Sequence, residues 1–247
     1  MEKESSRQIE MIRRNLEQVQ ANIQRAAEKS GRDPASVRLV VVTKTQPVVV
    51  VEAAIAAGAN CLGENYPEEA VRKMMDLKQT VSPEWHMIGH LQSRKAKLVV
   101  DHFELMHSLD SLRIAERLER LLAQADRILP VLLEFNVGGE PSKYGWDTSA
   151  EDRWENLLPE IEKILSLPHL EVQGTMTMPP FFMNADQTRP YFIKLRHLRD
   201  FLKERFPETR WDEMSMGTSV DYEAAISEGA TLVRIGEAIL GARPTKM

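Results

Sequence analysis

The chain has 247 residues, 43% hydrophobic and 28% charged, and 37 acidic against 32 basic residues give a formal net charge of −5. This balance is typical of a folded globular protein, and the acidic excess argues against a nucleic-acid-binding domain. No apolar run approaches the roughly 20 residues of a membrane span, the polar N-terminal segment differs from a signal peptide, and one cysteine cannot form an internal disulfide. We therefore expect a cytoplasmic protein with no nucleic-acid or membrane partner.

The first predicted element is an amphipathic helix. Apolar residues recur at spacings of three and four, at Ile9, Ile12, Leu16, Val19, Ile23 and Ala26, and Gly31 ends the pattern. The stripe is shorter than the roughly three to four heptads that indicate a coiled coil. We therefore favour a helix packed against its own domain, with a short coiled coil as the alternative.

After Gly31, short β-branched and apolar runs alternate with helical patterns. Strands are predicted at residues 37–43, 61–63, 84–88, 104–107, 130–136, 170–176, 213–216 and 231–235. The helices that follow them are predicted at residues 47–57, 67–77, 93–100, 111–124, 150–165, 187–205, 221–227 and 237–240. Eight such units predict an α/β fold, a single (β/α)8 TIM-type barrel with an extra N-terminal helix, over one domain of residues 1–247. An open doubly wound sheet is the alternative, but no Gly-x-Gly-x-x-Gly fingerprint follows the first strand.

Lys44 directly follows the first predicted strand. In a barrel the active site is built from the loops after the strands, which would place Lys44 at the mouth. Apolar surroundings disfavour its ammonium form, and a neutral amine is the nucleophile that forms a Schiff base with an aldehyde. Position alone favours the simpler interpretation, a strand-end lysine facing water.

Glycine-containing loops follow the seventh and eighth predicted strands. They contain Ser215, Met216, Gly217, Thr218 and Ser219, and then Arg234, Ile235 and Gly236. Glycine permits close approach of the backbone, hydroxyls donate, and phosphate sites of barrels are typically built here. The two loops together favour a phosphate site over a tight turn and a helix cap. The eighth strand closes against the first, so a phosphorylated aldehyde would fit between these loops and Lys44.

Seven short motifs also follow one another in order. They are residues 41–45 (Val-Val-Thr-Lys-Thr), 63–66 (Gly-Glu-Asn-Tyr), 85–95 (Trp-His-Met-Ile-Gly-His-Leu-Gln-Ser-Arg-Lys), 107–110 (His-Ser-Leu-Asp), 139–145 (Gly-Glu-Pro-Ser-Lys-Tyr-Gly), 215–217 (Ser-Met-Gly) and 233–236 (Val-Arg-Ile-Gly). Together they resemble the pyridoxal phosphate homeostasis protein family, which shares its barrel with the N-terminal domain of alanine racemase. Any one motif alone would not be specific.

The resemblance implies that Lys44 carries pyridoxal 5′-phosphate (PLP) as an internal aldimine. It implies a phosphate site formed by Ser215, Gly217, Thr218, Ser219 and Gly236. Asn65 is similar to the family's asparagine near the cofactor ring and Arg234 to its partner of the pyridine nitrogen, while Met216 and residues 177–179 would line the site. A guanidinium only donates hydrogen bonds, so Arg234 would favour an unprotonated ring nitrogen and weaken the cofactor as an electron sink.

The sequence departs from the family pattern at three positions. Gln46 replaces a frequent second lysine, which puts a role of that lysine in cofactor exchange in doubt; Thr218 replaces a frequent methionine and Gly138 a frequent serine. Lys143 matches a lysine of the family's glycine-rich loop. It is either a secondary contact for free cofactor or a solvated loop residue.

No metal site is expected. His86 and His90 are four residues apart, but their segment is predicted as strand and loop rather than helix, and no third ligand is evident. Cys61, within a short predicted strand, is expected to be a core thiol.

The resemblance implies a PLP-binding protein of vitamin B6 homeostasis, and we expect a monomeric carrier or buffer whose candidate recipients are PLP-dependent apoenzymes. The sequence stops soon after the eighth unit, so we do not expect the second, β-rich domain of alanine racemase or its tyrosine base, and robust catalysis is not expected. A weak PLP-dependent amino-acid racemase or lyase is the main alternative. The others are a lysine-dependent aldolase that holds a sugar phosphate, and a regulatory partner-binding module, which is compatible with the carrier.

Overall fold

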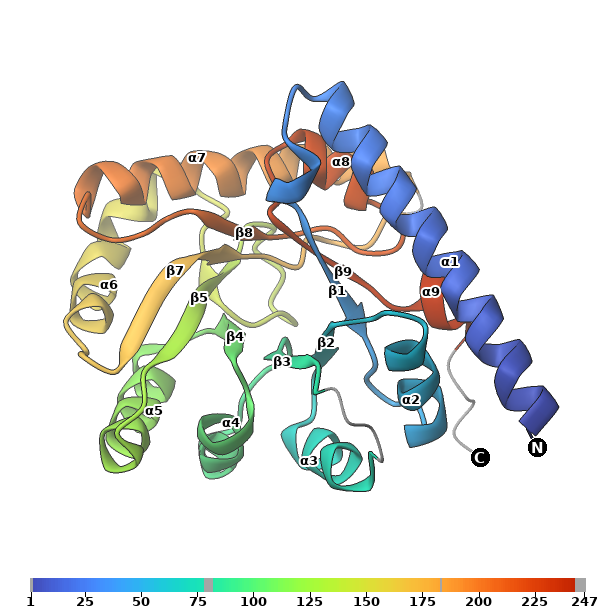
Figure 1. The fold of residues 1–247 in the computed structure, drawn as a ribbon. Coiled ribbons are helices and arrows are strands. Elements are labelled where there is room, and N and C mark those ends of the chain that lie inside the picture. The colour runs from blue at the N-terminus through green and yellow to red at the C-terminus, as the bar shows by residue number, and fades with distance from the viewer. Residues whose placement is uncertain (1, 78–81, 183, 243–247) are drawn as a thin grey trace.

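The computed structural model describes residues 2–77, 82–182 and 184–242. Its centre is a closed barrel of parallel strands surrounded by helices (Figure 1). The strands are β1 (Arg38–Val42), β2 (Cys61–Glu64), β3 (Glu84–Met87), β4 (Leu105–Leu109), β5 (Leu129–Asn136), β7 (Leu170–Met176), β8 (Glu213–Ser215) and β9 (Leu232–Ile235). They pair in this order, and β9 pairs with β1 to close the ring. The predicted barrel is confirmed, and the open doubly wound sheet is wrong.

Helices follow the strands as predicted. They are α2 (Val48–Ala56), α3 (Pro67–Asp76), α4 (Ala96–His102), α5 (Leu112–Ala125), α6 (Leu158–Leu165), α7 (Arg189–Arg205), α8 (Tyr222–Ser227) and α9 (Glu237–Leu240). The helix predicted over residues 150–165 is α-helical only in its second half. Residues Glu151–Leu157 form a 3₁₀ segment instead, and Pro159 stands at the start of α6. Proline has no N–H and is tolerated at a first helical turn but not inside a helix, which explains where α6 begins.

The extra helix α1 (Glu2–Lys29) packs across the outside of the barrel, beside α2, α8 and α9 (Figure 1). Its apolar stripe is buried, and Asn15 and Asn22 fix it by hydrogen bonds to the carbonyl of Ile239 and the hydroxyl of Tyr222. The helix therefore packs against its own barrel, as predicted, and the coiled-coil alternative is wrong. No helix in the described ranges combines the length and the apolar character needed to cross a membrane.

The barrel interior is arranged in layers because successive inward-facing side chains are two residues apart on each strand. An apolar layer consists of Val40, Cys61, Leu105, Leu132, Met176 and Leu232. Two residues further along β4, β5 and β9 lie His107, Glu134 and Arg234, all buried. The interior is thus apolar near its middle and polar toward the carboxyl ends of the strands.

A ninth strand, β6 (Trp146–Asp147), was not predicted. It pairs with the end of β5, through Phe135 and Asn136, outside the closed ring. Asn136 also bonds Glu140 through its side-chain amide, so the glycine-rich segment after β5 is folded against the strand end. Two residues flanked by glycine and threonine carry no periodicity that would reveal a strand.

Candidate functional site

A cavity of about 700 Å³ opens at the carboxyl ends of the strands. Small-molecule sites typically have volumes of about 300–1,000 Å³. Six predicted site residues line it: Lys44, Asn65, Thr218, Ser219, Arg234 and Gly236. Residues that are distant in sequence therefore share one cavity at the mouth, where strand-end loops of a barrel build a site.

Lys44 is half-buried and sits in a backbone segment held on both sides. The carbonyl of Thr43 accepts a hydrogen bond from Lys73 Nζ at 2.8 Å, and the N–H of Thr45 donates to Glu69 Oε1 at 2.7 Å. Thr45 has a left-handed backbone with φ of 63°. A non-glycine residue adopts this conformation at some cost, so the surrounding bonds must hold it. The position of Lys44 is therefore set by side chains of α3.

Lys73 is the centre of that support. Its ammonium lies 2.7 Å from Glu64 Oε1 and 2.6 Å from Glu69 Oε1, and it is 7% exposed. Glu64 is fully buried and also accepts from the hydroxyl of Thr43 at 2.8 Å. Sequence reasoning missed this group because its members have ordinary surface-helix and strand-end identities. Only the helical spacing of Glu69 and Lys73, four residues apart, gave a signal.

Arg234 is buried beneath the cavity. Its guanidinium donates to Ser215 Oγ and, at 2.9 Å, to the carbonyl oxygen of Thr177, and it contacts Met178 Sδ. Burial lowers the pKa of Arg234 to about 10, so it remains protonated at neutral pH. A fixed cation that can only donate is thereby presented to the cavity.

Ser215, Met216 and Gly217 lie in the wall rather than on the cavity surface. Ser215 Oγ is 2.7 Å from His107 Nδ1 and bonds Arg234, so it supports the guanidinium. Met216 is fully buried in the core. A Cβ on Gly217 would come within 2.7 Å of the Ala225 Cβ, and its φ of 95° also requires glycine. Gly217 thus allows the loop to pack directly on α8.

Thr218 already has partners for both donors. Asp221 Oδ1 accepts from its N–H at 2.7 Å and from its hydroxyl at 3.1 Å. Asp221 is buried, so a carboxylate lies beside the loop predicted to hold a phosphate. The structure therefore brings Thr218, Ser219 and Gly236 to the cavity. Among the described residues, only Thr218 of these three donates to Asp221.

Asn65 offers the clearest indication of a ligand. Its Oδ1 is buried and has no hydrogen-bond partner among the described residues. Gly89 packs against it, because a Cβ there would lie 2.6 Å from the Asn65 Cα. A buried acceptor is normally satisfied by protein or ordered water, and one left unpaired in a cavity wall can accept from a bound molecule. A PLP ring hydroxyl would supply such a donor, so the cavity, the cation at Arg234 and the amine of Lys44 fit this cofactor.

Glu134 is a site residue that sequence reasoning missed. It lies in the cavity wall and is 7% exposed. Burial, with a smaller contribution from the negative charge of Asp110, raises the pKa of Glu134 to about 7. A carboxyl group with this pKa changes protonation near neutral pH, as acid–base groups of enzymes do. Its place as the third residue from the end of a predicted strand was the available signal.

The departures from the family pattern have defined places. Gln46 is buried and lines the cavity. Lys143 lines the same cavity, donates to the carbonyl oxygen of Met178 at 2.9 Å and pairs with Glu140 at 2.8 Å, so it is held in place, and its contact with free cofactor stays a prediction. Gly138 packs on Pro180, whose Cδ would lie 3.0 Å from an added Cβ.

A chain of hydrogen bonds runs from Arg234 into the barrel interior. Ser215 accepts from Arg234, and its hydroxyl, 2.7 Å from His107 Nδ1, can donate to that nitrogen. Burial lowers the pKa of His107 well below its usual value and that of His86 to about 3, so both rings are neutral. His107 then carries its proton on Nε2 and donates to His86 Nδ1 at 2.9 Å. The proton of His86 is left on Nε2, which faces Glu84.

Comparison with known proteins identifies the family of this chain. A model of the alanine racemase N-terminal domain family matches residues 14–244. A pyridoxal phosphate homeostasis protein of Pasteurella multocida (strain Pm70) is 39% identical over 233 residues, which cover 94% of this chain and 97% of that protein. The chain belongs to the pyridoxal phosphate homeostasis protein family.

Solved structures extend this assignment. PipY of Synechococcus elongatus PCC7942, solved with PLP bound, has a TM-score of 0.76 and 34% identity, covering 89% of this chain and 100% of that one. An alanine racemase of Clostridium difficile 630 has a TM-score of 0.68 at 15% identity, covering 96% of this chain and 58% of that one. At that identity the likeness shows the fold alone. The pyridoxal phosphate homeostasis family thus has the barrel of alanine racemase.

Proposed function

We propose that this chain binds PLP as a Schiff base on Lys44 and acts in intracellular PLP homeostasis as a carrier or buffer without robust catalysis. The observation that carries the proposal is the shared cavity, which is lined by Lys44, Asn65 and the buried Arg234. The PLP-bound structure of the relative PipY supports the choice of cofactor.

The residues of the cavity have distinct roles in this proposal. Lys44 contributes the amine, which adds to the aldehyde carbon while one water leaves. Arg234 donates to the ring nitrogen and Asn65 Oδ1 accepts from the ring hydroxyl. Ser219 and Gly236 hold the phosphate, joined by Thr218 when its hydroxyl turns away from Asp221, and Ser215, Met216 and Gly217 lie in the wall behind them.

When bound, PLP supplies a conjugated ring that withdraws electrons from an attached amine. Arg234 limits this capacity because its protonated guanidinium, held by Ser215 and Thr177, cannot hand a proton to the ring nitrogen. The chain's residues therefore favour retention of the cofactor over stabilisation of a carbanion.

The deciding experiment is the absorbance spectrum of the purified protein before and after borohydride reduction, followed by mass mapping. We expect near-visible absorbance that reduction removes, with the modified peptide containing Lys44. Lys143→Ala serves as the control and should keep the adduct. Attachment at Lys143 would refute the role of Lys44 and assign the cofactor to another lysine. No adduct after incubation with PLP would refute the proposal and favour the cofactor-free aldolase.

A weak PLP-dependent amino-acid racemase or lyase is the competing function. The observation that favours it is Glu134, whose pKa of about 7 suits an acid–base group in the same cavity. Racemisation assays with a panel of L-amino acids separate the two. Turnover of about one per second, within the usual enzyme range, would contradict the carrier.

The remaining parts of the proposal concern the protein in the cell. We propose one PLP-binding domain over residues 1–247, a monomeric state, a cytoplasmic location and transfer of PLP to dependent apoenzymes. Light scattering tests the monomer. Mixing the loaded protein with an inactive apoenzyme, with free PLP trapped by a scavenger, tests direct transfer.

A further inference from the structure

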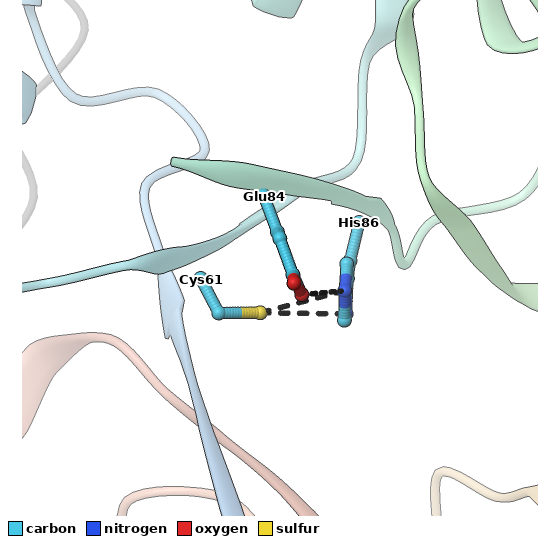
Figure 2. A group of neighbouring side chains, drawn as sticks. All are labelled: Cys61, Glu84 and His86. Carbon is cyan, nitrogen blue, oxygen red and sulfur yellow. Dashed lines mark hydrogen bonds and ion pairs between the residues drawn. The ribbon is translucent and has the colours of Figure 1, made fainter. Parts of the chain in front are cut away.

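Three potential metal ligands meet at the amino-terminal end of the barrel, opposite the cavity of Lys44. Cys61 is the first residue of β2 and Glu84 the first of β3, and the two are register partners in the sheet. His86 lies two residues further along β3, so its side chain is on the same face as that of Glu84. Figure 2 shows the three side chains converging.

Two of the separations between ligand atoms are close to those around one tetrahedral ion. Cys61 Sγ lies 3.5 Å from each ring nitrogen of His86, and His86 Nε2 lies 3.5 Å from Glu84 Oε2. All three ligand atoms lie within 4.8 Å of one another. Zinc bonds to sulfur, nitrogen and oxygen, set at tetrahedral angles, place neighbouring ligand atoms about 3.4–3.6 Å apart. Cys61 Sγ is equally far from both ring nitrogens, so its side chain would turn toward Nε2 when the group encloses an ion.

We propose that Cys61, Glu84 and His86 form a binding site for a divalent transition-metal ion, with Zn²⁺ as the best match. A thiolate, an imidazole and a carboxylate are the ligands that zinc takes in proteins, whereas magnesium and calcium prefer oxygen alone. This departs from the sequence-based expectation of no metal, because Cys61 and Glu84 become neighbours only through strand pairing.

The surroundings give an ion access to the three side chains. They also provide room for one further ligand in the fourth coordination position. A cavity of about 640 Å³ at this end of the barrel is lined by Cys61, Glu84, Asn60 and Ser82 among others. The side chain of Glu84 is 59% exposed, while His86 is buried. With three protein ligands, a water from this cavity would complete the tetrahedron, as in zinc sites that keep an open position.

The histidine is already oriented for this role. His86 Nδ1 is held by His107 Nε2 at 2.9 Å, and metal-bound histidines almost always have such a partner on the second nitrogen. Ligation through Nε2 moves the ring proton to Nδ1, which then donates to His107. Ser215 accepts from His107 and Arg234 together, within the capacity of a hydroxyl oxygen.

Negative charge predominates around the site. Arg38 lies close enough to affect both Cys61 and His86, but its guanidinium is paired with Glu213 at 2.9 Å. Glu104 adds a second negative charge near Cys61. A metal ion that binds Glu84 and displaces the thiol proton of Cys61 is therefore not repelled by an unpaired positive charge.

Cobalt substitution tests the proposal, because tetrahedral Co²⁺ bound to a thiolate has a charge-transfer band and intense visible bands. We expect one Co²⁺ to bind per chain, and we expect added Zn²⁺ to displace it and remove these bands. Cys61→Ser should remove the charge-transfer band, and Glu84→Gln should weaken Zn²⁺ binding at least about tenfold. Glu84 is largely exposed, so this variant should fold even if the cysteine variant does not.

His197→Asn, an exposed histidine on α7, is the matched control and should bind Zn²⁺ like the parent. Absence of the thiolate band, or Zn²⁺ binding that is equal in the parent, Cys61→Ser and Glu84→Gln proteins, would overturn the proposal. The readout is metal binding alone, so it is independent of whether Lys44 carries PLP.

Discussion

Lys73 Nζ lies 2.8 Å from the backbone carbonyl oxygen of Thr43, the residue before Lys44. We predict that Lys73→Met destabilises the protein by about 3–5 kcal/mol, because removing one partner leaves the fully buried Glu64 carboxylate uncompensated. It should also weaken PLP retention, since the segment carrying Lys44 loses its support. Urea unfolding and a PLP titration followed by absorbance measure the two effects.

Lys97→Met is the control for this variant. Lys97 forms an exposed pair with Asp101, and such pairs contribute about 0–1 kcal/mol. Equal stability of the Lys73 and Lys97 variants would show that the buried group does not support the site.

The pKa of about 7 for Glu134 predicts a pH dependence of stability. The ordinary value is 4.5, so between pH 4.5 and about 7 the native state binds more protons than the unfolded state. The contribution is full below pH 4.5 and is lost as the pH rises through 7, by about 3 kcal/mol for this difference. Urea unfolding at a series of pH values should show the decline in the parent and its loss in Glu134→Gln. A parallel decline in both proteins would assign it to other groups.

Arg234→Gln should alter the near-visible spectrum of the loaded protein and speed PLP loss about tenfold or more, because hydrogen bonds to charged groups contribute about 1.5–3 kcal/mol. Dialysis followed by absorbance measures the loss. Met178→Leu, which removes the sulfur contact to the guanidinium but keeps an apolar side chain in the cavity wall, should have a smaller effect on both properties. An unchanged spectrum and retention in Arg234→Gln would remove Arg234 from the cofactor ring.

Gly217→Ala should lower both stability and PLP affinity. An alanine at this φ of 95° has a strained backbone. In addition, its Cβ would lie 2.7 Å from the Ala225 Cβ and 2.9 Å from the Tyr222 Cα. Gly31→Ala separates the two causes, because Gly31 also has a positive φ, of 67°, but nothing lies within 4 Å. We expect the Gly217 variant to lose at least about 1–3 kcal/mol and the Gly31 variant less. Equal losses in thermal unfolding would mean that packing on α8 is unimportant.

The barrel could be predicted from the sequence because each strand is a short buried run bounded by turn residues. β1 and β7 illustrate this, since the predicted runs 37–43 and 170–176 contain or equal the observed strands. β6 was missed because pairing with the end of β5, rather than a hydrophobic run, creates it. The start of α6 was misjudged because Pro159 limits the α-helix to the second half of the pattern.

The candidate site was predictable only in part. Lys44 and the loops of Thr218 and Gly236 share one cavity because all follow strands of a closed barrel. The support of Lys44 by Lys73 depends on how α3 packs against β1 and β2, which no local pattern encodes. The contact between His86 and His107 depends in the same way on the pairing of β3 with β4.

The row of hydrogen bonds from Arg234 to His86 connects the carboxyl-terminal mouth of the barrel with its amino-terminal end. When the hydroxyl of Ser215 donates to His107, each donor of the row points away from the mouth, and a change in the tautomer of one histidine requires a change in the other. A cation captured by His86 at the base would reverse the two histidine protons and leave the serine hydroxyl facing a different acceptor. The absorbance of PLP held at the opposite mouth would then depend on whether an ion is bound at the amino-terminal end, with no movement of the strands between them.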